Sequence, residues 1–251
     1  MRSHSAAPPA PGAFVTGTDT DVGKTLVSAI LVKAWQADYW KPYQTGVADA
    51  CSDTDTVAAL LGPGGHTLHP PACILQAPLA PWAAARLEGV ALNAADLRLP
   101  RTQAPLVVEG AGGLYVPIDE RHMMLDLAAR LGLPLVLVTR STLGTINHTL
   151  LSLQALAARQ LPVMGVIMNG PLSPGNRKAL EHFGHTRILA EIPPLPRVDA
   201  AAIARMAAGI PPLASILPSP PPCRSQPDGI TKNYTSAHPL PAQGFSNHKS
   251  I

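Results

Sequence analysis

Aromatic side chains are scarce in this chain: they make up 4% of its 251 residues, whereas 46% of the residues are hydrophobic. Aliphatic side chains must therefore fill most of the core. Cysteine is also rare, because only Cys51, Cys73 and Cys223 occur, and they lack metal-type spacing. A disulfide framework and a cysteine-ligated metal site are excluded on this basis, and a reducing, cytoplasmic compartment is expected.

Charge is low as well, with 14% charged residues and a formal net charge of +3. No cluster of lysine and arginine resembles a nucleic-acid-binding surface. No apolar run approaches the roughly 18 residues that a membrane span requires. The alanine- and proline-rich start of the chain lacks the apolar segment of a signal peptide. Neither nucleic acid nor a membrane is therefore expected as a partner.

Short apolar runs alternate with helical patterns along most of the chain. The predicted strands are 13–16, 39–41, 105–109, 133–139, 163–169 and 188–192. The predicted helices are 24–37, 55–61, 79–87, 124–131, 145–159, 176–183 and 200–208. This alternation predicts an α/β fold, a doubly wound and mainly parallel sheet with helices on both faces. In such sheets, ligands bind beyond the carboxyl ends of the strands.

The pattern stops near Ile210. Residues 211–251 carry nine prolines and show no periodicity. Such a composition buries too little apolar surface to offset the entropy of ordering the chain. We therefore expect a flexible N-terminus over 1–11, one domain over 12–209, and a disordered, proline-rich tail over 210–251, with a proline-rich binding segment as the alternative for the tail.

The strongest motif lies at the start of the first predicted helix. An apolar strand leads into Gly17-Thr-Asp-Thr-Asp-Val-Gly-Lys-Thr25. Backbone N–H groups of such a loop hold phosphate, the lysine contacts the β- and γ-phosphates, and the Thr25 hydroxyl is a candidate Mg²⁺ ligand. The strict phosphate-loop pattern requires glycine at position 18, where this chain has Thr18. The loop is therefore a variant of the phosphate loop, and this variant limits the protein families to which the chain can belong.

Two further groups of polar residues lie at the end of the predicted strand 39–41 and shortly after it. Lys41 stands at the end of this strand, which Pro42 terminates, so it is expected to point toward the ligand crevice or to be an ordinary surface lysine. Asp53 and Asp55 precede a predicted helix. Each acid could cap that helix or hold a metal ion, and one of the pair could do each job.

The strand 105–109 ends in Glu109, followed by Gly-Ala-Gly-Gly. A carboxylate at the end of a buried strand resembles the acid that holds Mg²⁺ in phosphoryl-transfer enzymes. The glycines would let a substrate approach the backbone closely. A simple turn-capping acid is the alternative, which the glycine run disfavours.

The remaining candidates are weak when taken alone. Leu143-Gly-Thr-Ile-Asn-His148 opens a helix, so its N–H groups and Asn147 could hold a carboxylate; otherwise Thr145 is a helix cap and His148 a packed residue. Asn169 ends a strand and could bind a base edge or form a turn with Gly170.

Taken in order, these motifs resemble the signature blocks of the dethiobiotin synthetase family. The blocks are Gly17–Thr25, Lys41-Pro-Tyr-Gln-Thr-Gly46, Glu109-Gly-Ala-Gly-Gly113, Leu143–His148 and Glu191-Ile-Pro193, and the resemblance covers about residues 13–209. It implies a P-loop NTPase-like fold and a homodimer with substrate at the subunit interface. It also implies ATP- and Mg²⁺-dependent carboxylation and ring closure of 7,8-diaminopelargonate with CO₂.

The resemblance also implies roles for individual residues. The expected catalytic residues are Lys41, Lys24 and Thr18. The expected substrate-binding residues are Thr45, Gly112, Gly144 and Asn147, the last two from the partner subunit. The expected nucleotide-binding residues are Thr20, Asp21, Val22, Gly23, Lys24, Thr25 and Asn169, and the expected metal ligands are Thr25, Asp53 and Glu109. Asp53 rather than Asp55 is chosen by its spacing to Leu60-Leu-Gly62.

Two other classes of P-loop protein would each require a feature that this chain lacks. A partitioning or switch-type P-loop ATPase acting on protein partners would need a second lysine in the phosphate loop, where this chain has Asp19. An amide ligase of the cobyrinate type would need a glutamine amidotransferase domain with a catalytic cysteine. The chain has neither room for that domain nor a suitable cysteine motif.

Overall fold

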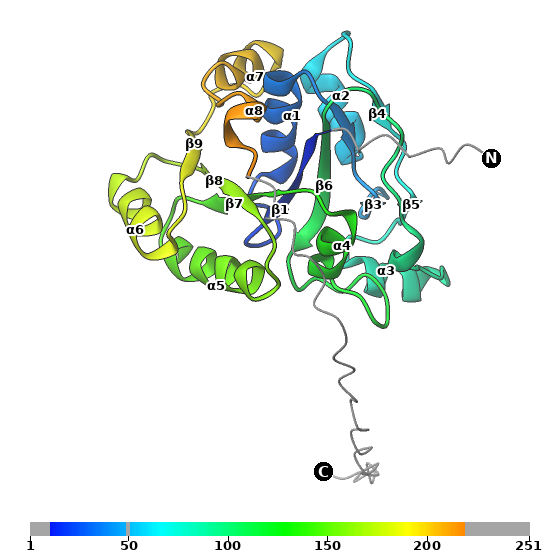
Figure 1. Cartoon of the computed structure of the whole chain (residues 1–251). Coiled ribbons are helices and arrows are strands. Elements are labelled where there is room, and N and C mark those ends of the chain that lie inside the picture. Colours follow the sequence, from blue (N-terminus) through cyan, green and yellow to red (C-terminus); the bar gives the residue numbers. More distant parts are fainter. Residues whose placement is uncertain (1–10, 49–50, 219–251) are drawn as a thin grey trace, which may run out of the picture. The chain divides into compact units, whose positions relative to one another are not determined.

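The computed structural model describes residues 11–48 and 51–218 (Figure 1). Its main element is a seven-stranded sheet in the order β4-β2-β6-β1-β7-β8-β9, in which each paired neighbour is parallel. The sheet strands are β1 (Gly12–Gly17), β2 (Asp38–Trp40), β4 (Leu68–His69), β6 (Leu106–Gly113), β7 (Leu135–Arg140), β8 (Val163–Asn169) and β9 (Ile188–Ile192). A separate parallel pair is formed by β3 (Tyr43–Gln44) and β5 (Cys73–Ile74).

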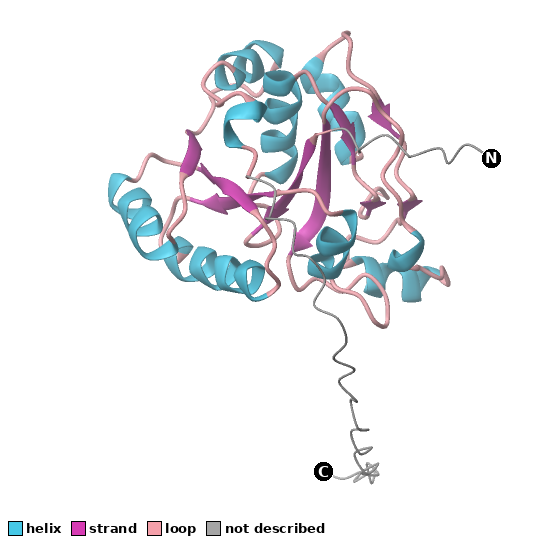
Figure 2. Ribbon diagram, viewed as in Figure 1, coloured by secondary structure: helices cyan, strands magenta, loops and turns pink. Residues whose placement is uncertain are grey.

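Helices pack on both faces of the sheet (Figure 2). They are α1 (Lys24–Trp35), α2 (Asp53–Leu61), α3 (Pro81–Glu88), α4 (Met124–Leu131), α5 (Thr145–Ala158), α6 (Pro174–Gly184), α7 (Ala200–Ala207) and α8 (Leu213–Ile216), with one 3₁₀ turn at Ala94–Asp96. The predicted doubly wound α/β fold, with a parallel sheet and helices on both of its faces, is confirmed. None of the helices in the described part of the chain is long and apolar enough to cross a membrane.

The two faces of the sheet have separate cores, because neighbouring residues of a strand point to opposite sides. In β1, Val15 joins the core under α1, α2, α7 and α8, whereas Phe14 joins the core under α4. A third cluster around Leu137 and Leu180 lies under α5 and α6. Aliphatic residues supply most of all three clusters, as the scarcity of aromatic residues predicted.

The folded part extends further than we expected. Ile210, Leu213 and Ile216 are buried against the core under α1, and the α8 helix carries two of them. Residues 210–218 therefore belong to the folded unit instead of the tail. The predicted tail over 219–251 and the N-terminal residues 1–10 lie outside the described residues.

Candidate active site

The phosphate loop occupies residues 18–23, between β1 and α1. Gly23 precedes α1 with φ of 91°, and no side chain caps the first N–H groups of this helix. A Cβ at Gly23 would lie 2.1 Å from Asn169 Nδ2, so glycine is required both by the left-handed backbone and by space. Uncapped N–H groups at a helix N-terminus form an anion-binding site.

Lys24 is buried behind this loop and donates from Nζ to the Asp19 carbonyl at 2.9 Å. Burial lowers the pKa of Lys24 to about 8, although the carboxylate of Glu109 opposes that shift. An anionic ligand stabilises the charged form of such a desolvated lysine, because the ligand replaces the favourable interactions that the ammonium group lost with water.

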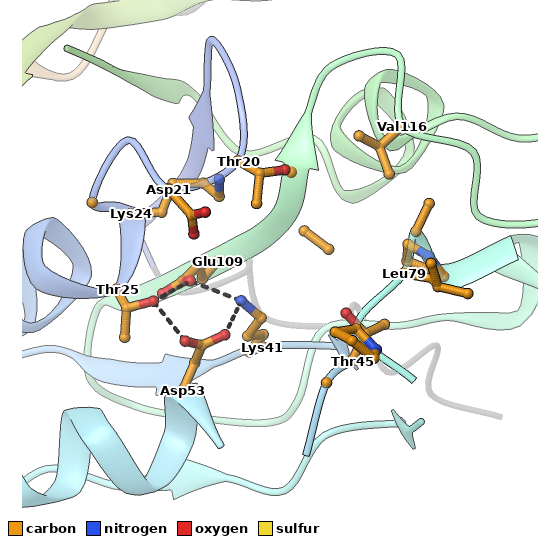
Figure 3. A pocket seen from close by; sticks show the side chains of 17 residues that line it. Thr20, Asp21, Lys24, Thr25, Lys41, Thr45, Asp53, Leu79, Glu109 and Val116 are labelled. Atoms are coloured by element: carbon orange, nitrogen blue, oxygen red, sulfur yellow. Dashed lines mark hydrogen bonds and ion pairs between the residues drawn. The ribbon is translucent and has the colours of Figure 1, made fainter. Parts of the chain in front are cut away.

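Four groups from four elements meet next to Lys24 (Figure 3). Thr25 Oγ1 lies 2.9 Å from Asp53 Oδ1 and 2.9 Å from Glu109 Oε1. Lys41 Nζ donates to Glu109 Oε1 at 2.9 Å and forms an ion pair with Asp53. Thr25 is the second residue of α1, Lys41 follows β2, Asp53 begins α2 and Glu109 is in β6, so the fold brings together residues that are distant in the sequence.

The opposite charges in this cluster stabilise each other's ionised forms. Burial alone would lower the pKa of Lys41, but the charges of Glu109 and Asp53 outweigh it and raise that pKa. Burial alone would raise the pKa of Asp53, but the charge and hydrogen bond of Lys41 outweigh it and lower that pKa. Lys41 is therefore a buried ammonium, and the interpretation as an ordinary surface lysine is wrong.

The two aspartates of α2 have different positions. Ser52 caps the helix by accepting a hydrogen bond from the Asp55 N–H, and the exposed Asp55 carboxylate accepts one from the Ser52 hydroxyl. Neither acid is the N-cap, so the expectation that one of the pair caps the helix is wrong. Because serine takes this role, Asp53 is free to turn into the cluster with Lys41.

A cavity of about 650 Å³ opens beside the cluster. Ten of the predicted residues line it: Thr20, Asp21, Gly23, Lys24, Thr25, Lys41, Thr45, Asp53, Glu109 and Gly112. The cavity is also lined by apolar residues that were not among the predicted site residues: Pro78, Leu79, Ala80, Pro81, Ala111 and Val116. One cavity therefore has a charged end and an aliphatic side.

Gly112 shows why the run after Glu109 is rich in glycine. Its φ is 63°, and a Cβ there would lie 2.6 Å from Val116 Cγ2 and 3.5 Å from Thr20 Oγ1. The backbone thus forms the cavity wall directly. The run belongs to β6, which continues to Gly113 instead of ending at Glu109 as predicted, because Gly113 still pairs with Gly17.

Five predicted residues do not line this cavity. Thr18 Oγ1 lies 3.4 Å from Thr139 Oγ1 and faces a smaller cavity of about 280 Å³. Val22 is buried in the core under α1, and Asn169 Nδ2 donates to its carbonyl at 3.0 Å. Gly144 and Asn147 are exposed at the start of α5. Gly144, not Thr145, is the helix cap, and His148 is exposed and not packed.

The sequence is similar to those of known proteins. The AAA domain family matches residues 12–202. An ATP-dependent dethiobiotin synthetase BioD from Paramagnetospirillum magneticum is 54% identical over 210 residues, which cover 84% of this chain and 99% of that protein. The chain belongs to the dethiobiotin synthetase family. A second BioD, from Rhodopseudomonas palustris, is 46% identical over 75% of this chain and 89% of its own length.

A bifunctional relative is longer. The biotin biosynthesis bifunctional protein BioCD of Bordetella avium is 64% identical over 83% of this chain, but the chain spans only 45% of that protein's length. Among solved structures, a ParA family ATPase from Chlorobium tepidum matches 79% of this chain and 98% of its own with 12% identity and a TM-score of 0.43. Similarity at this level carries no argument about function.

The cluster has the donor chemistry of a magnesium site. Mg²⁺ binds one or two carboxylates together with substrate phosphates and other oxygen ligands. The Thr25 hydroxyl lies 2.9 Å from a carboxylate oxygen of Asp53 and 2.9 Å from one of Glu109, so the three side chains supply oxygen donors to one small region. Among the residues described, no three His, Cys, Asp or Glu side chains gather into a metal-binding group, so an all-protein metal cage is not formed there.

Proposed function

We propose that this member of the dethiobiotin synthetase family uses the cavity beside Lys41 to convert 7,8-diaminopelargonate, CO₂ and ATP to dethiobiotin, ADP and phosphate. One amine of the diamine attacks CO₂ and loses a proton, which gives a carbamate. A carbamate oxygen then attacks the γ-phosphorus, and ADP leaves. The second amine attacks the carbonyl carbon and loses a proton, and phosphate leaves with that oxygen, which closes the cyclic urea.

Anionic groups form at each of these stages, so buried cations contribute most to the rate. Lys24 is assigned to the β- and γ-phosphates and Lys41 to the carbamate and the transferred phosphoryl group. Thr45 is assigned a hydrogen bond to the carbamate. We expected Thr18 to donate another, but Thr20 lines the cavity and Thr18 does not, which favours Thr20 for this role.

Magnesium is assigned to Thr25, Asp53 and Glu109 on the basis of their oxygen donors. When bound, it would neutralise charge on the phosphates. The chain's own residues supply the rest of the proposed site. Backbone N–H groups at Gly23 and the start of α1 bind the phosphates, and the apolar wall around Leu79 and Val116 excludes water from the carbamate. Asn169 keeps a carbonyl oxygen for adenine while its amide donates to Val22.

A homodimer completes the proposed site. Gly144 and Asn147, assigned to the substrate carboxylate, are exposed instead of facing the cavity of their own subunit. Leu143 beside them is fully exposed, and Tyr115 and Leu151 are more than half exposed. Large exposed apolar side chains, near ligand-binding residues that their own subunit leaves unused, are typical of a surface that another subunit covers. Cytoplasmic localisation stays a prediction from cysteine content.

The observation that carries this proposal is the ion-paired cluster of Lys41, Asp53 and Glu109, beside an aliphatic wall suited to a short carbon chain. The test is ADP release measured with and without 7,8-diaminopelargonate, in the presence of bicarbonate and Mg²⁺. We expect ADP release to require the diamine. Equal ATP hydrolysis without the diamine would favour the switch-type ATPase, which the dethiobiotin synthetase relatives do not support.

A further inference from the structure

A tyrosine outside the cavity contacts the acid assigned to magnesium. Tyr39 lies in the middle of β2, is fully buried, and donates its hydroxyl hydrogen to Glu109 Oε2 at 3.0 Å. It belongs to none of the site residues assigned above. Its ring lies in the core under α1, so solvent cannot replace the hydrogen bond that it makes.

The sheet register explains the contact. Tyr39 is paired with Val107 of the neighbouring strand β6, and both side chains face the core under α1. Glu109 is two residues further along β6 and so points to the same face. Two strand residues span about 6.6 Å, close to the length of a tyrosine side chain. The phenol therefore reaches from the Val107 level to the Glu109 level.

The two carboxylate oxygens of Glu109 consequently have separate partners. Oε1 faces the cavity, where Thr25 Oγ1 and Lys41 Nζ both lie 2.9 Å away. Oε2 accepts from Tyr39 beneath the cavity floor. Glu109 is almost completely buried, so without the phenol its Oε2 would have no water to accept from. A carboxylate in that position turns toward the donors that are left, and here these are Thr25 and Lys41.

We propose that Tyr39 is a positioning residue that holds Glu109 by Oε2, so that Oε1 alone is presented to Thr25, Lys41 and the magnesium ion. This inference rests on the proposed function, because it concerns the same metal site. Tyr39 touches neither substrate nor metal in this account, and it acts only through Glu109. The competing explanation is that Glu109 merely satisfies a tyrosine buried for packing.

The test compares Tyr39→Phe with Tyr43→Phe. Tyr43 is also buried, but it lies in the core on the other face of the sheet and does not line the cavity. For the wild type and both variants, ADP binding is measured by calorimetry at a series of free Mg²⁺ concentrations, which gives an apparent Kd for Mg²⁺. Thermal unfolding without ligands is measured beside it.

We expect Tyr39→Phe to raise the apparent Kd for Mg²⁺ about tenfold, the effect of losing one hydrogen bond to a charged group. ADP binding without Mg²⁺ should be unchanged, and Tyr43→Phe should not change the Mg²⁺ dependence. In a Glu109→Gln background, Tyr39→Phe should add no further effect on Mg²⁺ dependence, because the phenol acts through the carboxylate. If Tyr39→Phe unfolds at 25 °C, the titrations of the wild type and both variants are made at 10 °C, near the temperature at which folded domains are most stable.

An unchanged Mg²⁺ dependence in Tyr39→Phe, with or without a lower unfolding temperature, would overturn the inference and leave Tyr39 a packing residue. The same shift in Tyr43→Phe would also overturn it. Failure of the proposed function is recognised separately, since the wild-type protein would then form no dethiobiotin whatever the Mg²⁺ dependence of ADP binding.

Discussion

Replacement of Lys41 by alanine tests the charge balance of the cluster. The variant leaves Asp53 and Glu109 without their shared cation. Each acid has an oxygen 2.9 Å from Thr25 Oγ1, and both are at least partly buried. These oxygens are therefore less than about 6 Å apart, and at an effective dielectric constant of about 20 their repulsion is about 3 kcal/mol. That figure agrees with the roughly 3–5 kcal/mol lost when one partner of a buried ion pair is removed.

For a domain of this size, about 3 kcal/mol corresponds to a fall in Tm of about 6–12 °C. The assay is thermal unfolding at pH 7.5 with EDTA, using Lys33→Ala as the control because Lys33 is an exposed lysine of α1. Mg²⁺ should recover part of the lost stability in Lys41→Ala and have less effect on the wild type. In turnover, Lys41→Ala should lower kcat about 10²-fold or more, with ATP binding retained.

The loss of stability should also depend on pH with a defined sign. Lys41 lowers the pKa of Asp53 in the folded state, so this pair contributes stability above the unfolded pKa of about 4 and loses it as the pH falls through the folded value. The difference in Tm between the wild type and Lys41→Ala should therefore shrink below about pH 4. Equal Tm values at pH 7.5, or a deficit that persists unchanged at acid pH, would refute this reasoning.

Three further predictions follow from the same site. Because burial lowers the pKa of Lys24 to about 8, ATP binding should take up a proton near pH 8 and weaken above it, which calorimetry in buffers of different ionisation enthalpy would detect; binding without proton uptake would contradict this. Gly23→Ala should abolish ATP binding in equilibrium titrations while the fold is retained, because the new Cβ would meet Asn169; unchanged affinity would argue against the tight loop. Leu143→Asp should shift the protein to monomer in sedimentation velocity and remove turnover, whereas an active monomer would contradict the proposed shared site.

Much of the fold follows from local patterns in the sequence. The continuous apolar run that gives β7 and the helix over Met124–Leu131 are both present in the structure, because strand hydrophobicity and the glycine after the helix act locally. The short strands β3, β4 and β5 were not predicted. Two residues carry no periodicity, so only pairing with distant segments defines such strands.

The end of the domain was misplaced for a related reason. Proline-rich composition after Ile210 resembles a tail, yet Leu213 and Ile216 are spaced to bury one side of a single helical turn. Trp35 Nε1 also donates to the Pro211 carbonyl, and Arg187 donates to the Ile216 carbonyl. These contacts join residues far apart in the sequence, so no local signal could reveal them.

Local sequence motifs single out some of the residues that line the cavity. Lys24, Thr25 and Glu109 follow from a strand, a loop and a helix start, and they line the cavity together with Lys41 and Asp53. Whether Thr18 or Thr20 lines the cavity depends on the direction in which the loop turns each side chain. The sequence of the loop does not specify this direction. Tyr39 was missed because its importance depends on the register between β2 and β6, which appears only when the strands pair.

The most direct test of the account is incubation of the purified chain with ATP, Mg²⁺, 7,8-diaminopelargonate and ¹³C-bicarbonate, followed by mass spectrometry. We expect dethiobiotin that carries one ¹³C atom in its urea carbonyl, formed in a one-to-one ratio with ADP and absent when any component is omitted. ATP turnover by the folded protein without labelled dethiobiotin would contradict the assignment of the cavity to carbamate formation and ring closure.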